Sequence, residues 1–295
     1  MERTLQPPAP FTLQHIKRVY SLHSDSSCCW EGNSLYMVFQ ETNSLVLVKI
    51  QELGKPDQPL LHVATSTRKE FFPDFSHIFS FQDDLKEFYS SVRSDPIMNQ
   101  LISRYYGTRI FHTRDFFESA IIAILEQQIS VQVAAKLRER IVQKFGRGPI
   151  EYDGMVFRSF PTPLDFLGIS VEEIGSIGMS MNKAKAIHHL ANALIEGKFQ
   201  SQCLSPQSIE QSIKKLISLP GIGSWSAQYI LTRGLAWDNM VAYSDLGIRK
   251  AIGYYYKKGQ SVTVEESREF FEHFSPWKHI AGYYFLMDLI IYSPY

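Results

Sequence analysis

A turn between two predicted helices has the residue types of a phosphate-binding site. Gly221 and Gly223 flank the apolar Ile222, and their missing Cβ atoms allow another molecule to come close to the backbone. The second helix is expected to begin near Ser224, with Ser226 in the same turn, and free N–H groups at a helix start attract phosphate. We expect Ile222 to fill the gap between the two helices. A Gly-x-Gly pair alone is also compatible with an ordinary corner between helices.

Asp245 is the acidic residue that follows this turn. It precedes a predicted helix at 246–256, and Arg249 and Lys250 lie about one turn further on. An Asp in that position caps the helix, which stabilises it by about 1 kcal/mol. Taken alone, capping is its more common role. Asp245 also lies twenty residues after Trp225, downstream of the glycine turn, and this placement keeps a catalytic role open.

The segment 208–235 contains the phrase Leu-Pro-Gly-Ile-Gly-x-Trp-x-Ala, which resembles a helix-hairpin-helix. Together with Asp245, it is similar to the helix-hairpin-helix–Gly/Pro–Asp superfamily of DNA base-excision glycosylases, and within it to the AlkA type, 3-methyladenine DNA glycosylase II. The resemblance covers about residues 105–291. It implies that the hairpin grips one strand of double-stranded DNA through its phosphates without reading the bases. It also implies that Asp245 is catalytic.

Two further segments support this resemblance. The segment 120–137 is similar to the family's helix–loop–helix, which places a side chain into the gap left by a flipped base. Gln128 aligns with that wedge, and Gln127 is beside it. The segment 177–194 resembles another family signature, in which Lys183 would contact DNA. The alternative for both segments is that they are ordinary core helices.

The residue at position 225 separates the subfamilies. Relatives that also cleave the DNA strand have a Lys there, which forms a Schiff base, whereas this chain has Trp225. The resemblance therefore implies a monofunctional glycosylase. Trp225 and Tyr229 lie four residues apart on one helix face, and in this family such aromatics line the base pocket. The alternative is that both rings belong to the core.

The sequence departs from the family pattern in two places. The family has a Pro a few residues before the catalytic Asp, where this chain has Ala242-Tyr-Ser. A pocket Trp is replaced, with Leu286 nearest to its position. These departures leave open a glycosylase for other damaged purines or a non-catalytic helix-hairpin-helix DNA-binding protein.

The resemblance implies a definite reaction. The damaged nucleotide leaves the base stack, and hydrolysis of the N-glycosidic bond builds positive charge on the sugar, which Asp245 would stabilise directly or through an oriented water. Alkylated purines such as 3-methyladenine and 7-methylguanine are cationic, and aromatic faces attract them. No cofactor is expected. The family's hairpin can hold a monovalent cation through backbone carbonyls, here those of Ile217, Leu219 and Ile222.

The elements that must position these residues fall into two parts. Residues 1–104 predict a small α+β domain, with strands at 34–40, 44–50 and 60–64, a turn at 41–43, a helix at 81–92 and a loose proline-containing N-terminus. This part resembles the family's TATA-binding-protein-like sheet domain in length and texture. Residues 105–295 are expected to form the helical glycosylase region. The pattern is almost wholly helical from about residue 95 onward, so the predicted fold is mainly α. The expected helices are 114–128, 130–145, 182–194, 208–219, 224–234, 246–256, 264–274 and 279–291.

Composition narrows the class of protein. The chain has 295 residues, with 30 basic and 30 acidic side chains. Residues 176–258 hold ten Lys or Arg against four acids, a local basic excess of the kind that a DNA footprint needs, although solvated helix faces would also account for it. Three cysteines are too few for a four-cysteine iron–sulfur site. With no membrane or secretion signal, we expect a cytoplasmic monomer, associated with the nucleoid if the source is bacterial.

Overall fold

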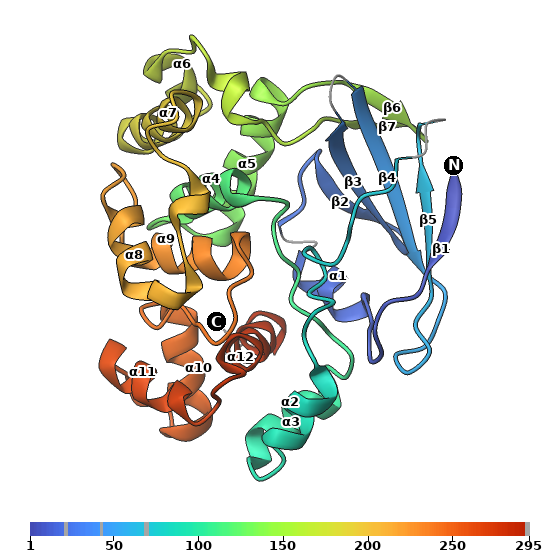
Figure 1. The fold of residues 1–295 in the computed structure, drawn as a ribbon, viewed down its shortest axis with the longest axis vertical. Coiled ribbons are helices and arrows are strands. Elements are labelled where there is room, and N and C mark those ends of the chain that lie inside the picture. The colour runs from blue at the N-terminus through green and yellow to red at the C-terminus, as the bar shows by residue number, and fades with distance from the viewer. Residues whose placement is uncertain (21–22, 42–43, 68–70, 293–295) are drawn as a thin grey trace.

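A five-stranded antiparallel sheet forms one side of the molecule, in the order β1-β5-β4-β3-β2 (Figure 1). The computed structural model describes residues 1–20, 23–41, 44–67 and 71–292. The strands are β1 (Glu2–Leu5), β2 (Cys28–Glu31), β3 (Ser34–Glu41), β4 (Ser44–Glu52) and β5 (Leu61–Thr65). The three predicted strands are thereby confirmed as β3, β4 and β5. Residues 42 and 43 of the predicted turn lie outside the described residues.

The prediction of a loose N-terminus is wrong. Residues 2–5 form the edge strand β1, paired with β5. The following prolines are held as well, because the buried Arg109 donates hydrogen bonds to the carbonyls of Pro8 and Pro10. An edge strand is held by backbone hydrogen bonds and needs no apolar alternation of its own, so its sequence gave no signal.

Each face of the sheet is covered by a different element. Helix α1 (Gln14–Tyr20) packs Ile16 into a core with alternate strand residues such as Val48 and Ile50. The opposite face holds Tyr36, whose ring centroid is 5.4 Å from that of Phe157. Phe157 belongs to a hairpin of β6 (Ile150–Tyr152) and β7 (Met155–Phe157). The prediction of an almost wholly helical chain after residue 95 is wrong at this hairpin.

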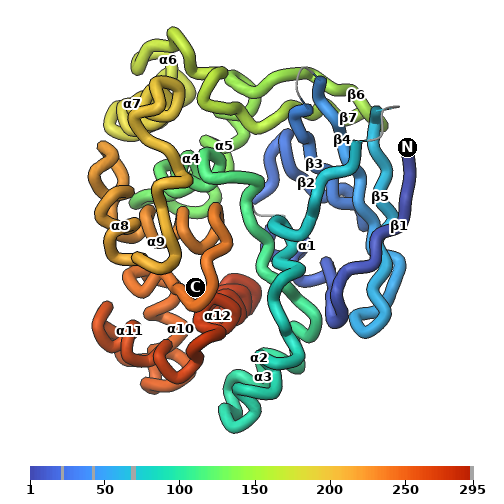
Figure 2. The backbone as a smooth tube through the Cα atoms, in the orientation of Figure 1, coloured from blue at the N-terminus to red at the C-terminus, as the bar shows by residue number. Residues whose placement is uncertain are grey.

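The remainder of the chain is mainly helical, and its helices share two cores. One core joins α4 (Phe116–Glu126), α5 (Val131–Phe145), α6 (Val171–Gly175), α7 (Met181–Ile195), α8 (Ile209–Ile217) and α9 (Ser224–Tyr229). The other joins α2 (Leu85–Ser91), α3 (Pro96–Arg104), α10 (Leu246–Tyr256), α11 (Val264–Glu272) and α12 (Lys278–Tyr292). Figure 2 shows α2 and α3 beside α12, far along the chain from it. The helices predicted after residue 105 are confirmed to within a few residues.

The structure bears on the boundary predicted at residue 104 and on the predicted helix at 81–92. α2 begins only at Leu85, because Asp84 caps it by accepting from two backbone N–H groups. α2 and α3 share a core with the C-terminal helices and not with the sheet. The division at 104 and the TATA-binding-protein-like topology stay predictions. Within the described part of the chain, no helix combines the length and apolarity needed to cross a membrane.

Buried polar contacts join the sheet part to the helices. Arg138 of α5 places Nε 2.8 Å from Asp25 Oδ2, and both side chains are almost fully buried. One residue further along α5, Glu139 accepts hydrogen bonds from the backbone N–H and hydroxyl of Ser26. The loop before β2 is thereby fixed against α5, close to the cavity described next.

Candidate active site

Asp245 has two roles in the structure. It is the N-cap of α10, where Oδ1 accepts from the Ile248 backbone N–H at 3.0 Å. Its other oxygen, Oδ2, accepts from Trp225 Nε1 at 2.6 Å. Both oxygens are therefore held in place by donors from two different helices. A carboxylate fixed in this way can stabilise positive charge that develops beside it without first reorganising.

The Asp245 carboxylate lines a cavity of about 300 Å³, the lower end of the usual range for ligand pockets. Trp225 and Tyr229 form part of its wall, with ring centroids 5.5 Å apart. Burial raises the pKa of Tyr229 well above its ordinary value, so its hydroxyl stays neutral. Ala242 and Leu286, the two departures from the family pattern, line the same cavity. Its wall is mainly apolar with a few polar groups.

The side of the cavity formed by α4, α5 and the sheet part carries ionisable groups that sequence reasoning missed. Glu126, His23 and Arg138 lie here. Burial raises the pKa of Glu126 to about 7, assisted by the negative charge of Asp245. Burial lowers the pKa of His23 to about 4. The one available sequence signal was a glutamate at the end of the apolar helix α4.

The two hairpin glycines have different surroundings. Gly221 has a φ of +83°, and a Cβ atom there would come within 2.3 Å of the Ala186 Cβ. It is thus required for the turn and for packing against α7. A Cβ at Gly223 would meet nothing within 4 Å, so only Gly223 presents open backbone to a partner. Ile222 is 4% exposed, as expected for a residue that fills the gap between the helices.

Two residues predicted to contact DNA have hydrogen-bond partners inside the protein. Ser226 is 1% exposed, and its hydroxyl accepts from Gln127 Nε2 at 2.9 Å. Its side chain therefore does not face solvent, and its contact with DNA stays a prediction. Lys183 donates its ammonium hydrogens to the carbonyls of Leu125 and Gln127 at 2.6 and 2.8 Å, which holds the end of α4. Sequence spacing cannot show that these groups are already engaged.

The loop after α4 presents one of its two glutamines to solvent. Gln127 Nε2 also donates to the Gly221 carbonyl at 2.9 Å, which joins this loop to the hairpin. Gln128 is exposed and has a φ of +55°. Ser224 is exposed as well. The structure thus brings Gln128, Gly223 and Ser224 to the surface.

The hairpin carbonyls offer a chemically suitable donor set for a monovalent cation. α8 ends at Ile217, and carbonyls in the last turn of a helix lack helical partners and favour positive charge. The Leu219 carbonyl accepts from the Ile222 N–H at 3.1 Å, which leaves it a second lone pair. These groups fit the cation that the sequence resemblance implies.

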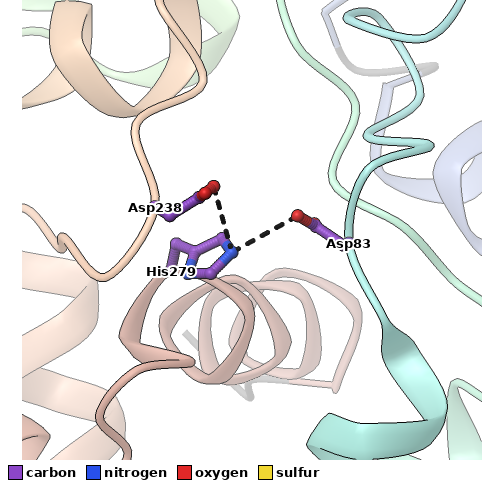
Figure 3. Close-up of side chains that lie close together, drawn as sticks. All are labelled: Asp83, Asp238 and His279. Carbon is purple, nitrogen blue, oxygen red and sulfur yellow. Dashed lines mark ion pairs between the residues drawn. The ribbon is translucent and has the colours of Figure 1, made fainter. Parts of the chain in front are cut away.

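A second group of ionisable side chains lies beside the cavity (Figure 3). His279, at the start of α12, places Nε2 3.5 Å from Asp83 Oδ1 and 3.7 Å from Asp238 Oδ1. Its Nδ1 accepts from the Asn239 backbone N–H at 3.1 Å, so the neutral ring carries its proton on Nε2. That nitrogen then has no lone pair for a metal ion. His279 thus anchors the loop before Asp245 through its contacts with Asp238 and Asn239.

Comparisons with known proteins point to one family. The model of the HhH-GPD superfamily base excision DNA repair proteins matches residues 121–276. A DNA-3-methyladenine glycosylase of Bacillus subtilis is 26% identical over 254 residues, 86% of this chain and 82% of the relative. DNA-3-methyladenine glycosylase 2 of Escherichia coli is 31% identical over 175 residues, 59% of this chain and 58% of the relative. A solved 3-methyladenine DNA-glycosylase from Archaeoglobus fulgidus shares the fold, with a TM-score of 0.81 over 98% of both chains at 23% identity.

Proposed function

The chain belongs to the HhH-GPD superfamily of base excision DNA repair proteins, and from this premise we propose that it is a monofunctional DNA glycosylase for alkylated purines. Its substrates are bases such as 3-methyladenine and 7-methylguanine in double-stranded DNA. The observation that carries the proposal is the fixed Asp245 carboxylate in a cavity walled by Trp225 and Tyr229. The names of the relatives in Bacillus subtilis and Escherichia coli support the choice of lesion.

DNA would be held by the hairpin and the loop after α4. The open backbone at Gly223 and the N–H groups at the start of α9 bind the phosphates of one strand, with Ser224 beside them. The exposed Gln128 fills the space that the flipped nucleotide leaves, at a cost of a few kcal/mol for unstacking. A cation on the carbonyls of Ile217, Leu219 and Ile222 would add positive charge next to those phosphates.

Asp245 acts on the bond between sugar and base. As that bond breaks, positive charge develops on the sugar, and the carboxylate stabilises it or orients the attacking water. The alkylated purine is already cationic and leaves without strong acid catalysis, while Trp225 and Tyr229 offer electron-rich faces to it. No lysine is among the described residues that line the cavity. Without an amine nucleophile, the product is an intact strand with an abasic site.

Base release from methylated duplex DNA tests this function. We expect free 3-methyladenine and 7-methylguanine by chromatography, and strand breaks only after alkali treatment. Strand breaks without alkali would contradict the monofunctional assignment. Release of oxidised or deaminated purines, but not methylated ones, would instead support a glycosylase for other damaged purines.

A further inference from the structure

Glu126 faces the base cavity without a partner for its carboxylate. It is the last residue of α4, its side chain is 21% exposed, and it lines the same cavity as Asp245. Among the described residues, none donates a hydrogen bond to this carboxylate. His23 lies beside it, with Nδ1 3.8 Å from Oε1. A partly buried carboxylate without a donor is costly for the free protein, which points to a ligand that supplies one.

The surrounding groups offset a negative charge on Glu126 only in part, because its pKa stays raised although the charges of Arg138 and Lys183 lower it. Burial lowers the pKa of His23 to about 4, so its ring is neutral near pH 7. Arg138 is already paired with Asp25, and Lys183 is held by two carbonyls. The remaining ionisable side chains that line the cavity are Asp245, Tyr20, Tyr229, Arg233, His279 and Tyr283. The guanidinium of Arg233 donates a hydrogen bond to the Phe111 carbonyl.

We propose that Glu126 is a specificity-determining residue, whose carboxylate accepts an N–H of the flipped purine and balances that base's positive charge. The inference rests on the proposed function and extends it, since it predicts a preference for cationic purines over neutral damaged ones. A carboxylate accepts a hydrogen bond from either kind of base. Only a cationic base adds attraction between opposite charges, so Glu126 discriminates by charge as well as by shape.

Binding would be coupled to loss of a proton. Burial raises the pKa of Glu126 to about 7, so the free protein near pH 7 holds the carboxyl group partly protonated. A cationic base favours the ionised form, and the carboxyl O–H bond then breaks and its proton passes to the solvent. When enzyme and substrate concentrations are low enough for the rate to depend on binding, the excision rate of a cationic base is therefore expected to rise between pH 6 and pH 8.

The test compares two lesions in duplex DNA, 3-methyladenine, which carries a fixed positive charge, and hypoxanthine, which is neutral. In Glu126→Gln we expect 3-methyladenine release at pH 7.5 to fall about tenfold, with hypoxanthine release within about twofold of wild type. The rise between pH 6 and pH 8 is expected to disappear. The matched control is Glu139→Gln, which removes a carboxylate at the same junction with the sheet part and outside the cavity; its lesion preference and pH profile are expected to match wild type.

Each result assigns failure to one claim. Unchanged lesion preference in a folded Glu126→Gln overturns the role of Glu126 while leaving the proposed function intact. A wild-type rate that falls between pH 6 and pH 8 also overturns it, because Glu126 would then act as an acid. Absence of any base release by wild type overturns the proposed function itself. If Glu126→Gln does not fold, the wild-type pH profile and Glu126→Asp, which keeps the charge, decide.

Discussion

The two walls of the base cavity differ in chemistry and in how the chain builds them. The hairpin wall (Trp225, Tyr229 and Asp245) is formed by residues within one stretch of sequence, and it offers aromatic faces and a fixed carboxylate. The junction wall (His23, Glu126 and Arg138) comes from three separate segments and carries ionisable groups. In the roles proposed above, the hairpin wall breaks the bond and contacts the face of the base, while Glu126 of the junction wall adds selection by charge.

The largest effect is expected on the stability of the junction wall. Arg138→Met leaves Asp25 buried without its charge partner, which we expect to lower the free energy of unfolding by about 3–5 kcal/mol. The pair is 2.8 Å apart and nearly inaccessible to solvent. Urea unfolding measures the loss. The control, Arg147→Met, breaks the more exposed pair with Asp165 and is expected to cost about 1 kcal/mol or less. Equal losses in the two variants would contradict the claim that burial makes the Asp25–Arg138 pair more costly to break than an exposed pair.

Glu126→Gln is expected to stabilise the free protein in a pH-dependent way. Burial raises the folded-state pKa from 4.5 to about 7, so the folded state binds the proton more tightly than the unfolded state. Wild type therefore loses stability as pH rises from about 4.5 to 7. The variant should be more stable at pH 8 by on the order of 3 kcal/mol, at about 1.4 kcal/mol per unit, and nearly equal to wild type below pH 4.5. Urea unfolding at pH 4.5, 6.5 and 8 measures this, and a pH-independent difference would refute it.

Trp225→Phe tests the hairpin wall without removing its aromatic surface. The change deletes the N–H that holds Asp245 Oδ2, so we expect single-turnover excision to slow by about 10²-fold through lost orientation. The control is Tyr229→Phe, which keeps the aromatic ring. Because Tyr229 donates no hydrogen bond to Asp245 in the described structure, this change should alter the rate less than about threefold. A normal rate in Trp225→Phe would show that Asp245 needs no orientation by this donor.

The smallest effect is expected at the surface of the hairpin. Gly223→Arg places a bulky side chain where the backbone is open, and we expect DNA affinity to fall about tenfold at fixed salt, measured by fluorescence anisotropy, with little change in thermal stability. Gly221→Ala should instead lower thermal stability, because the residue has a φ of +83° and a Cβ there would clash with Ala186. If both variants lose DNA affinity and neither loses thermal stability, the two glycines share one role and the distinction is refuted.

Local patterns predicted the hairpin wall because its parts are close in sequence. Residue spacing predicted the helix cap at Asp245, the burial of Ile222 between the helices, and the helices themselves. Alternation of apolar and polar residues predicted strands β3, β4 and β5. The junction wall depends on contacts between distant segments, such as Glu126 with His23, which spacing does not encode. The partners of Ser226 and Lys183 are hidden from spacing for a related reason. Their residue types suit a phosphate, and only the fold shows that Ser226 is buried and that both side chains have partners inside the protein.

The central claim is that the Asp245 carboxylate drives excision of an alkylated purine in this cavity. The most direct measurement is release of 3-methyladenine from methylated duplex DNA by wild type and by Asp245→Asn, compared at equal DNA occupancy. The account predicts release by wild type and a loss of at least about 10²–10³-fold in the variant, with DNA affinity within about twofold. Excision by Asp245→Asn at the wild-type rate would contradict it.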